Sequence, residues 1–341
     1  MAKKLEHIDS LAFPILVGDI GGTNARFALL ADAAGEPIVF PVVPTADYPN
    51  IDDAIEAVVF AHTAIRPKTA VLAIAGPVDG EEIELTNSPW VVRPHALIAD
   101  LGFEDVLILN DFEAQALAVS ALPESGRDPI GGGTVLEGAS RVVMGPGTGL
   151  GVAGLIRSRD RWIPVPGEGG HMDLGPRTER ERAIWPHLET LEGRVSGEQV
   201  LCGRGLVNLY HAIAAADGAS ATLTLPAEVS EAAAKGADPA AHEAVQLFAV
   251  ILARVAGDLA LVFMARGGVY IAGGVFGRIA ALVDPAAMRE AFEDKAPHRE
   301  LMRGIPLFSV TLPLAALAGL AAFARRPHLY ALETAHRRWS R

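Results

Sequence analysis

The chain has 341 residues and a formal net charge of −12, because 41 Asp and Glu outnumber 29 Lys and Arg. Half of the residues are hydrophobic, which excludes wholesale disorder, and single cores commonly divide beyond roughly 250–300 residues, so two lobes with a cleft are expected. The acidity and the lack of a long basic run argue against nucleic-acid binding, which needs a concentrated positive surface.

The first third of the sequence predicts a strand-rich opening followed by alternating helices and strands. Apolar runs at residues 14–20, 26–31 and 37–43 predict three strands, the first two joined by a Gly-Gly-Thr-Asn turn. A helical stripe follows at about 51–65. The remaining elements are a strand at 69–76, a strand and turn at 83–90, a helix at 93–102, a strand at 105–111 and a helix at 112–122.

The pattern restarts at residues 140–156 with a strand, a glycine turn and a second apolar strand. Two such units, about 125 residues apart, predict a duplicated architecture in which each half supplies one glycine hairpin to a shared ligand. Loops are expected up to residue 195. The later elements are helices near 196–217 and 239–266, a strand at 268–274 followed by a helix, a strand at 306–311 and an apolar helix after it.

Two stretches, residues 245–267 and 312–326, are apolar enough to raise the question of a membrane. The first contains Arg254 and Asp258, and the apolar part of the second is too short for a bilayer of about 30 Å, so both predict buried helices. Cys202 is the single cysteine, which excludes an intrachain disulfide and a cysteine-based structural zinc site. The first ten residues lead into no signal-peptide core, and we therefore expect a cytoplasmic protein.

The first glycine turn, Gly21-Gly22-Thr23-Asn24, is typical of a backbone anion site. Small residues let N–H groups approach an anion closely. Asp19 precedes the turn and does not attract phosphate itself, so its expected partner is Mg²⁺ or a magnesium-bound water. A tight hairpin with Asp19 in an Asx turn explains the same residues without a ligand.

The second turn lies in "GPGTGLGVAG", which contains more glycine than a hairpin needs. Gly149, Gly151 and Gly154 also form G-x-G-x-x-G, which permits a dinucleotide site. A Rossmann motif requires a helix directly after the glycines, whereas the sequence here predicts a strand. Neither turn is followed by the Gly-Lys-Ser/Thr of a Walker A motif.

Polar residues that suit a sugar occur at three further places. Asn110 and Asp111 stand where a strand meets a helix, Glu168 and His171 share a Gly-Pro loop, and Glu198 lies at a helix start. An aspartate at a strand end can accept a hydroxyl proton, while carboxylates, amides and imidazole suit hydroxyls that both donate and accept. The alternatives are helix capping by Asp111, solvated glutamates and a structural histidine.

Taken together, these stretches resemble the bacterial glucokinase family, within the superfamily of sugar kinases, actin and heat-shock chaperone ATPases. "GDIGGTNARFAL" is similar to its first phosphate motif, "LNDFEAQA" to its catalytic aspartate segment, "GPGTGLGVA" to its second phosphate motif and "VYIAGGVFGRI" to its adenosine-side segment. The resemblance covers nearly the whole chain. The related repressors carry an N-terminal helix-turn-helix and a cysteine-rich zinc motif, for which this sequence has neither room nor cysteines, so regulation through DNA is not expected.

The resemblance implies a two-lobed α/β fold of the actin-like (ribonuclease H-like) ATPase type, with an interdomain cleft. It implies ATP-dependent phosphorylation of D-glucose at the 6-hydroxyl, with Asp111 as general base, Mg-ATP as donor and a homodimer as the assembly. The implied sugar ligands are Asn87, Asn110, Asp111, Glu168, His171 and Glu198. The implied nucleotide contacts are Gly21, Gly22, Thr23, Asn24, Gly147, Thr148, Gly149, Gly273 and Gly274, with Asp19 toward the metal.

The expected lobes are discontinuous. Residues 1–121 with 313–341 form the smaller lobe, residues 122–312 form the larger one, and the hinge is expected near residues 120–125 and 310–314. Two other classes remain: a nicotinamide-dependent oxidoreductase based on "GLGVAG", which predicts no need for Mg²⁺, and a non-catalytic ATP-binding module of the same fold, which predicts no sugar site.

Overall fold

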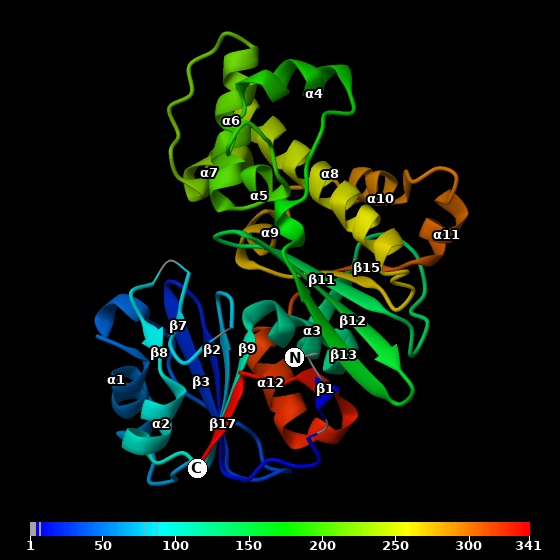
Figure 1. Ribbon diagram of the computed structural model, residues 1–341. Helices are drawn as coiled ribbons and strands as arrows, with labels where there is room; N and C mark the ends of the chain where they lie inside the picture. The colour runs from blue at the N-terminus through cyan, green and yellow to red at the C-terminus, as the bar shows by residue number, and fades with distance from the viewer. Residues whose placement is uncertain (1–4, 7, 79, 87) are drawn as a thin grey trace. The chain divides into compact units, whose positions relative to one another are not determined.

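A computed structural model describes residues 5–6, 8–78, 80–86 and 88–341. The chain divides into two compact units (Figure 1). Unit 1 comprises Met1–Leu122, Leu155–Pro166 and Leu312–Arg341, and unit 2 comprises Pro123–Gly154 and Gly167–Thr311. Residues 155–166, which the sequence assigns to the larger lobe, group with unit 1 because a long strand pair carries them away from the turn at 147–149.

Unit 1 contains a mixed sheet whose strand order is β17-β9-β6-β2-β3-β4, with β5 also paired to β3. β2, β6 and β9 are parallel, whereas β3, β4, β5 and β17 add in antiparallel fashion. The strands are β2 (Ile15–Ile20), β3 (Asn24–Leu30), β4 (Ile38–Val39), β5 (Val43–Pro44), β6 (Thr69–Ile74), β9 (Asp105–Asn110) and β17 (Arg338–Ser340). Short pairs are formed by β1 (Leu5–Glu6) with β16 (Leu332–Glu333), and by β7 (Ile83–Glu84) with β8 (Val91–Val92).

Helices cover both faces of this sheet. Alternate residues of β2 point to opposite sides, so Leu16 and Ile20 pack with α1 (Ile51–Ile55) and α2 (Pro94–Leu101), while Ile15 and Val17 pack with α3 (Asp111–Ala121) and α12 (Ala315–Arg325). α12 lies directly against α3 (Figure 1). Because both faces are buried, the parallel strands are almost entirely apolar, as the sequence shows for β6 and β9.

The carboxyl ends of the three parallel strands meet at one edge of the sheet. Ile20 of β2 pairs with Ile74 of β6, and Ile74 pairs with Asn110 of β9. The residues that follow these positions therefore emerge side by side, which is where ligand sites of α/β sheets collect. Asp19, the first glycine turn and Asp111 all belong to this edge.

Unit 2 is built on a second mixed sheet with the order β10-β15-β14-β11-β12-β13, whose last two strands extend into the residues grouped with unit 1. The strands are β10 (Arg127–Pro129), β11 (Arg141–Pro146), β12 (Leu150–Ser158), β13 (Arg161–Gly167), β14 (Val269–Ile271) and β15 (Leu307–Val310). β11, β14 and β15 are parallel. The strand, glycine turn and strand predicted at 140–156 are confirmed.

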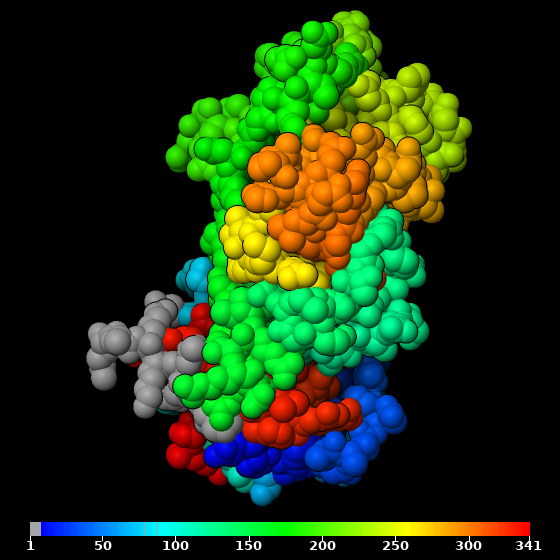
Figure 2. All heavy atoms as spheres, turned by 90° about the vertical axis from the view of Figure 1, so that its right-hand side faces the viewer, coloured from blue at the N-terminus to red at the C-terminus, as the bar shows by residue number. Residues whose placement is uncertain are grey.

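Helices form most of the remaining mass of unit 2. They are α4 (Glu179–Ile184), α5 (Gly197–Val200), α6 (Gly203–Ala216), α7 (Pro226–Lys235), α8 (Pro239–Val262), α9 (Gly274–Ile279), α10 (Pro285–Glu293) and α11 (Arg299–Gly304). α8 is long and apolar enough to cross a membrane, but it runs through the core and is mostly buried, as the sequence predicts. α10 packs on α8, and the surface of α10 and α11 is seen in orange in Figure 2.

Several predicted elements differ from the observed ones. The strand expected at 37–43 is broken into β4 and β5, because Pro41 has no N–H to donate to a ladder. The helix expected to reach residue 65 ends at Phe60, and Thr63 Oγ1 then accepts from the Ile65 N–H at 3.1 Å in a local turn. β13 and α4 replace loops expected before residue 195, and α7, α10, α11, β16 and β17 were not predicted.

Candidate active site

The first glycine turn is a closed hairpin between β2 and β3. The Gly21 N–H donates to the Asn24 carbonyl at 2.9 Å, which closes the turn. Thr45 braces it from outside, since its N–H donates to the Thr23 carbonyl at 3.0 Å and its hydroxyl donates to the Gly22 carbonyl at 3.0 Å. The turn is thus fixed by its carbonyl groups. The Gly21 N–H is engaged in the turn itself, so any phosphate contact falls to the N–H groups that follow it.

Asp19 lies on β2 directly opposite Arg26 of β3. Its side chain is 17% exposed, and its Oδ2 accepts from Arg26 Nη1 at 3.2 Å. Burial raises the pKa of the Asp19 carboxyl, and the Arg26 guanidinium opposes that rise. The Asx turn weighed as the alternative for Asp19 gives way to this cross-strand ion pair, which the sequence analysis missed although Arg26 belongs to the same motif.

Asn110 caps α3, and Asp111 is the first residue of the helix. Asn110 Oδ1 accepts from the Phe112 N–H at 2.9 Å, and its Nδ2 donates to the Gly76 carbonyl at 3.2 Å. The alternative interpretation, in which Asp111 caps the helix, is wrong because Asn110 takes the cap position. Asp111 remains half-buried at the helix start, with its Oδ1 3.0 Å from the Phe112 N–H.

Two residues that the sequence analysis missed hold this helix start in place. Glu113 Oε2 accepts from the Asn110 N–H at 2.9 Å, completing a capping box. Arg337 donates to both oxygens of Glu113, at 3.0 and 2.8 Å. Burial raises the pKa of Glu113 despite this partner. The Asn-x-x-Glu spacing is a signal that could have identified Glu113, whereas Arg337 has no local signature.

The second glycine turn lies at the carboxyl edge of the unit 2 sheet. The Gly147 N–H donates to the Gly149 carbonyl at 2.8 Å, so this turn is also closed on itself. Gly273, at the end of the parallel neighbour β14, has φ of +94°, and a Cβ there would lie 2.6 Å from the Pro146 carbonyl oxygen. Gly273 and Gly274 therefore lie beside the second turn. The backbone of the turn comes so close to position 273 that a residue with a side chain does not fit there.

Glu168 and His171 lie together on the loop after β13. The His171 N–H donates to the Glu168 carbonyl at 3.0 Å, and His171 Nε2 is 3.8 Å from Glu168 Oε2. The His171 side chain is 48% exposed and the Glu168 side chain is 85% exposed. Arg194 binds the His171 carbonyl and also Asp173, at 2.9 Å. The loop is thus held by its backbone, and the two side chains stay accessible.

Glu198 approaches the same loop from α5. The Gly197 N–H donates to the Met172 carbonyl at 2.9 Å, which fastens the helix start to the loop after His171. Glu198 Oε2 accepts from the Leu150 N–H, at the beginning of β12, at 3.0 Å. Unit 2 therefore gathers Glu168, His171, Glu198 and the second turn. Unit 1 gathers Asp19, the first turn, Asn110 and Asp111. Asn87 lies outside the described residues.

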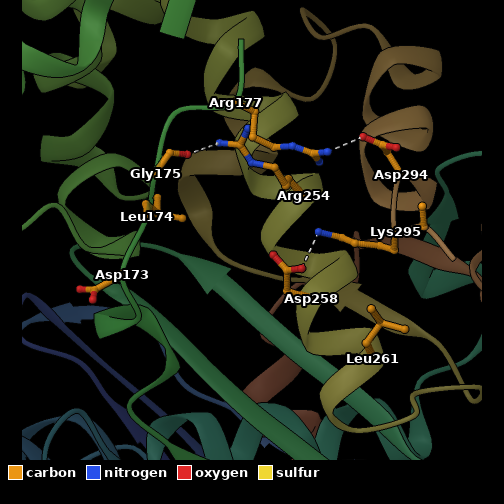
Figure 3. Close-up of a pocket in the computed structure, with 10 residues that line it drawn as sticks. Asp173, Leu174, Gly175, Arg177, Arg254, Asp258, Leu261, Asp294 and Lys295 are labelled. Atoms are coloured by element: carbon orange, nitrogen blue, oxygen red, sulfur yellow. Dashed lines mark hydrogen bonds and ion pairs between the residues drawn. The ribbon is translucent and has the colours of Figure 1, made fainter. Parts of the chain in front are cut away.

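A separate polar pocket of about 520 Å³ lies in unit 2 among α8, the loop at 173–177 and the segment at 294–296 (Figure 3). Its cations are matched by neighbouring acids: Arg177 with Asp294 at 2.8 Å, Lys295 with Asp258 at 2.5 Å, and Arg254 with the buried Glu181 at 2.9 Å. These pairs connect four segments: the loop at 173–177, the segment at 294–296, α8 and α4. The pocket contains none of the site residues predicted from the sequence.

The residues at the first turn suit a magnesium ion that arrives with a nucleotide. Mg²⁺ in kinases is held by one or two carboxylates together with substrate phosphates and water. Asp19 offers one half-buried carboxylate beside a backbone turn, which meets that requirement. No cluster of three or more His, Cys, Asp or Glu suited to a metal occurs in the described part of the chain, so a metal cage made of protein alone is not formed there.

Two α/β units, each with a strand, glycine turn and strand at its sheet edge, define the actin-like ATPase fold that sugar kinases share. β12, rather than a helix, follows the second turn, which removes the basis for a nicotinamide site. The model of the glucokinase family matches residues 16–327. The chain belongs to the glucokinase family.

Individual relatives agree with this assignment. A glucokinase from Mesorhizobium japonicum is 59% identical over 97% of this chain and 97% of its own length. The crystal structure of a glucokinase from an Antarctic psychrotroph has a TM-score of 0.81 and 33% identity, covering 92% of this chain and 98% of that one. A ROK family glucokinase from Streptomyces griseus, in complex with glucose and AMPPNP, shares the fold with a TM-score of 0.63 and 22% identity, covering 92% and 99%.

Proposed function

We propose that this chain transfers the γ-phosphoryl group of ATP to the 6-hydroxyl of D-glucose, giving glucose 6-phosphate and ADP. Membership in the glucokinase family supports the reaction class. The observation that carries the mechanism is the position of Asp111. It begins α3 at the sheet edge that also holds Asp19 and the first glycine turn, while Asn110 relieves it of the capping role.

Asp111 is the general base in this proposal. Its carboxylate takes the proton of the 6-hydroxyl as the sugar oxygen attacks the γ-phosphorus, and the bond from that phosphorus to the bridging oxygen of ADP breaks. The capping box and Arg337 hold the backbone of this helix start, so the carboxylate approaches the hydroxyl from a fixed position.

The phosphates are assigned to the two glycine turns. The first turn contributes N–H groups of Gly22, Thr23 and Asn24, and the second contributes Thr148 and Gly149, because the N–H groups of Gly21 and Gly147 close their own turns. Mg²⁺, when bound, neutralises charge on the phosphates. Asp19 is the residue that would hold Mg²⁺, directly or through a water molecule. Gly273 and Gly274 have no side chains and would allow adenosine to approach the backbone closely.

The sugar is assigned to Glu168, His171 and Glu198 of unit 2, with Asn110, Asp111 and Asn87. The exposed carboxylate of Glu168 and the accessible imidazole of His171 can accept from and donate to hydroxyls, as a polyol requires. The reaction requires residues of both units to bind the same glucose and ATP molecules. Residues 1–121 with 313–341, and residues 122–312, are proposed as the working lobes, in a cytoplasmic homodimer that needs no nucleic acid or membrane.

The deciding experiment measures ADP release from ATP and Mg²⁺ with glucose, mannose, fructose or N-acetylglucosamine added separately, beside a control without sugar. Release that depends on glucose supports the proposal. If ADP is released only with another sugar, that sugar replaces glucose as the proposed substrate and the proposed mechanism stands. If no sugar increases ADP release, the proposed activity is contradicted. Omission of Mg²⁺ is expected to stop release, which separates this reaction from a nicotinamide-dependent one.

A further inference from the structure

Glu198 contacts the backbone at the second glycine turn. Its Oε2 accepts from the Leu150 N–H at 3.0 Å, directly after Gly149. A Cβ at Gly149 would lie 2.3 Å from the same oxygen, so the turn leaves just enough room for the carboxylate. The proposed sugar ligand of α5 and the proposed phosphate turn are therefore in direct contact within unit 2.

The backbone around this contact is equally close. The Gly203 N–H, at the start of α6, donates to the Gly147 carbonyl at 2.9 Å. A Cβ at Gly170 would lie 2.0 Å from the Leu150 carbonyl oxygen, and one at Gly197 would lie 2.9 Å from the Gly170 carbonyl oxygen. The histidine loop, the start of α5 and the second turn are packed without space for side chains between them, so a displacement of one is transmitted to the others.

We propose that Glu198 couples sugar binding to nucleotide binding, an inference that rests on the proposed function. A carboxylate can accept several hydrogen bonds with its two oxygens. One oxygen holds the turn through Leu150, and the other accepts a sugar hydroxyl. Sugar binding then fixes the carboxylate and, through it, the turn, so that a nucleotide meets a turn that is already ordered and binds more tightly.

Thermodynamic reciprocity gives this coupling a measurable form. If glucose raises nucleotide affinity by some factor, the nucleotide must raise glucose affinity by the same factor, and such factors are typically about 5–150. Calorimetric titration with AMPPNP and Mg²⁺, with and without saturating glucose, measures the factor without turnover. The converse titration of glucose checks it.

Two matched variants separate the coupling from ordinary sugar binding. Glu198→Ala removes both contacts, so we expect weaker nucleotide binding even without sugar and a coupling factor reduced to near one. Glu168→Ala removes an exposed carboxylate whose side-chain partner is His171, so glucose binding should weaken while nucleotide affinity without sugar and the coupling factor are retained. Thermal unfolding of both variants checks that the fold persists.

A third variant changes the contact between Glu198 and the second turn on the side of the turn. In Gly149→Ala the new Cβ displaces the end of a flexible glutamate side chain rather than backbone, so the fold should tolerate it. We expect weaker glucose binding in the absence of nucleotide. Unchanged glucose affinity there, or a wild-type coupling factor retained in Glu198→Ala, overturns the inference.

The test remains decisive if glucose is the wrong substrate. A wild-type chain that binds no glucose contradicts the proposed substrate. The nucleotide affinity of Glu198→Ala without sugar still decides the link to the turn: a loss relative to wild type and to Glu168→Ala supports it, and no change contradicts it.

Discussion

Asp19 and Arg26 face each other across β2 and β3, with Arg26 Nη1 at 3.2 Å from Asp19 Oδ2. Burial works against ionisation of this carboxylate and the guanidinium works for it. Arg26 thus favours the charged form of Asp19 at the position proposed for the cation, and a bound Mg²⁺ would compete with Arg26 for that carboxylate. The positive charge of Arg26 thus lies beside the negative charge of Asp19 next to the first turn.

The metal assignment predicts a specific defect in Asp19→Asn. The amide keeps the size of the side chain but removes the charge, so we expect the Mg²⁺ concentration for half-maximal rate to rise about tenfold or more, equivalent to about 1.4 kcal/mol. Initial rates over a magnesium titration at fixed ATP measure this. Asp100→Asn, which changes an exposed acid near the end of α2, is the control and should match the wild type. An unshifted titration for Asp19→Asn would remove it from the metal site.

Loss of the base should remove most of the turnover while the fold persists. We expect Asp111→Ala to lower kcat by about 10²–10⁴-fold, the usual contribution of general base catalysis. Asp111→Ala removes one hydrogen bond from the Phe112 N–H but leaves the capping box of Asn110 and Glu113, so the unfolding midpoint in urea should stay close to that of the wild type. Formation of glucose 6-phosphate and equilibrium unfolding are measured on the same sample. A kcat within twofold of wild type would contradict the role.

Substitutions in the histidine loop should affect sugar and spare nucleotide. Glu168→Gln and His171→Ala remove accessible hydroxyl partners, and we expect the KM for sugar to rise about tenfold with little change in the KM for ATP. Stability should be unaffected because the loop is held by backbone contacts and Arg194. Steady-state kinetics with each substrate varied in turn provides the measurement. Equal increases in both KM values would count against a sugar contact.

The buried Glu113–Arg337 pair predicts a stability that depends on pH. The side chains are 2% and 13% exposed, and Arg337→Met leaves a buried carboxylate without its cation, which should cost about 3 kcal/mol near pH 8. Burial raises the folded-state pKa of Glu113 above its ordinary value of 4.5, and the variant raises it further. The folded state then retains a proton that the unfolded state releases, so stability falls as pH rises above about 4.5.

Urea unfolding at pH 5 and pH 8 tests this sign. The deficit of Arg337→Met should be smaller at pH 5, where Glu113 can stay protonated. Arg93→Met is the control, because its partner Glu82 and Arg93 itself are exposed and such pairs contribute about 0–1 kcal/mol. A deficit that does not change between the two pH values would show that Arg337 acts through packing alone.

Local sequence patterns predicted both glycine hairpins and their flanking strands, because apolar runs on either side of a glycine turn leave few alternatives. The predictions were wrong where a single residue interrupts the expected backbone hydrogen bonds. Pro41 does so in the strand expected at 37–43, and Thr63 does so in the helix expected to reach residue 65. Some missed helices did carry a signal: Asp284 caps α10 before Pro285, in the same way that Asp238 caps α8 before Pro239. The sequence prediction places the α8 start correctly at residue 239, whereas the same signal at Asp284 was not used to predict α10.

Other features have no local signal at all. Arg337 meets Glu113 across 224 positions of sequence, and β17 pairs with β9 over a similar separation. Nothing near either partner indicates the other. The contact between Glu198 and Leu150 is likewise set by how α5 packs on the turn, so the sequence could suggest the two functions and could not show that they touch.

The pairing of β17 with β9 and of α12 with α3 also has a consequence for synthesis on the ribosome. The helix that carries Asp111 emerges early, yet its packing partner and the arginine that holds its first turn lie within residues 315–340. Most of unit 2 is translated in between and has its own core. Unit 1 therefore obtains its last sheet strand and the arginine that holds the start of α3 only after residues 337–340 have been made.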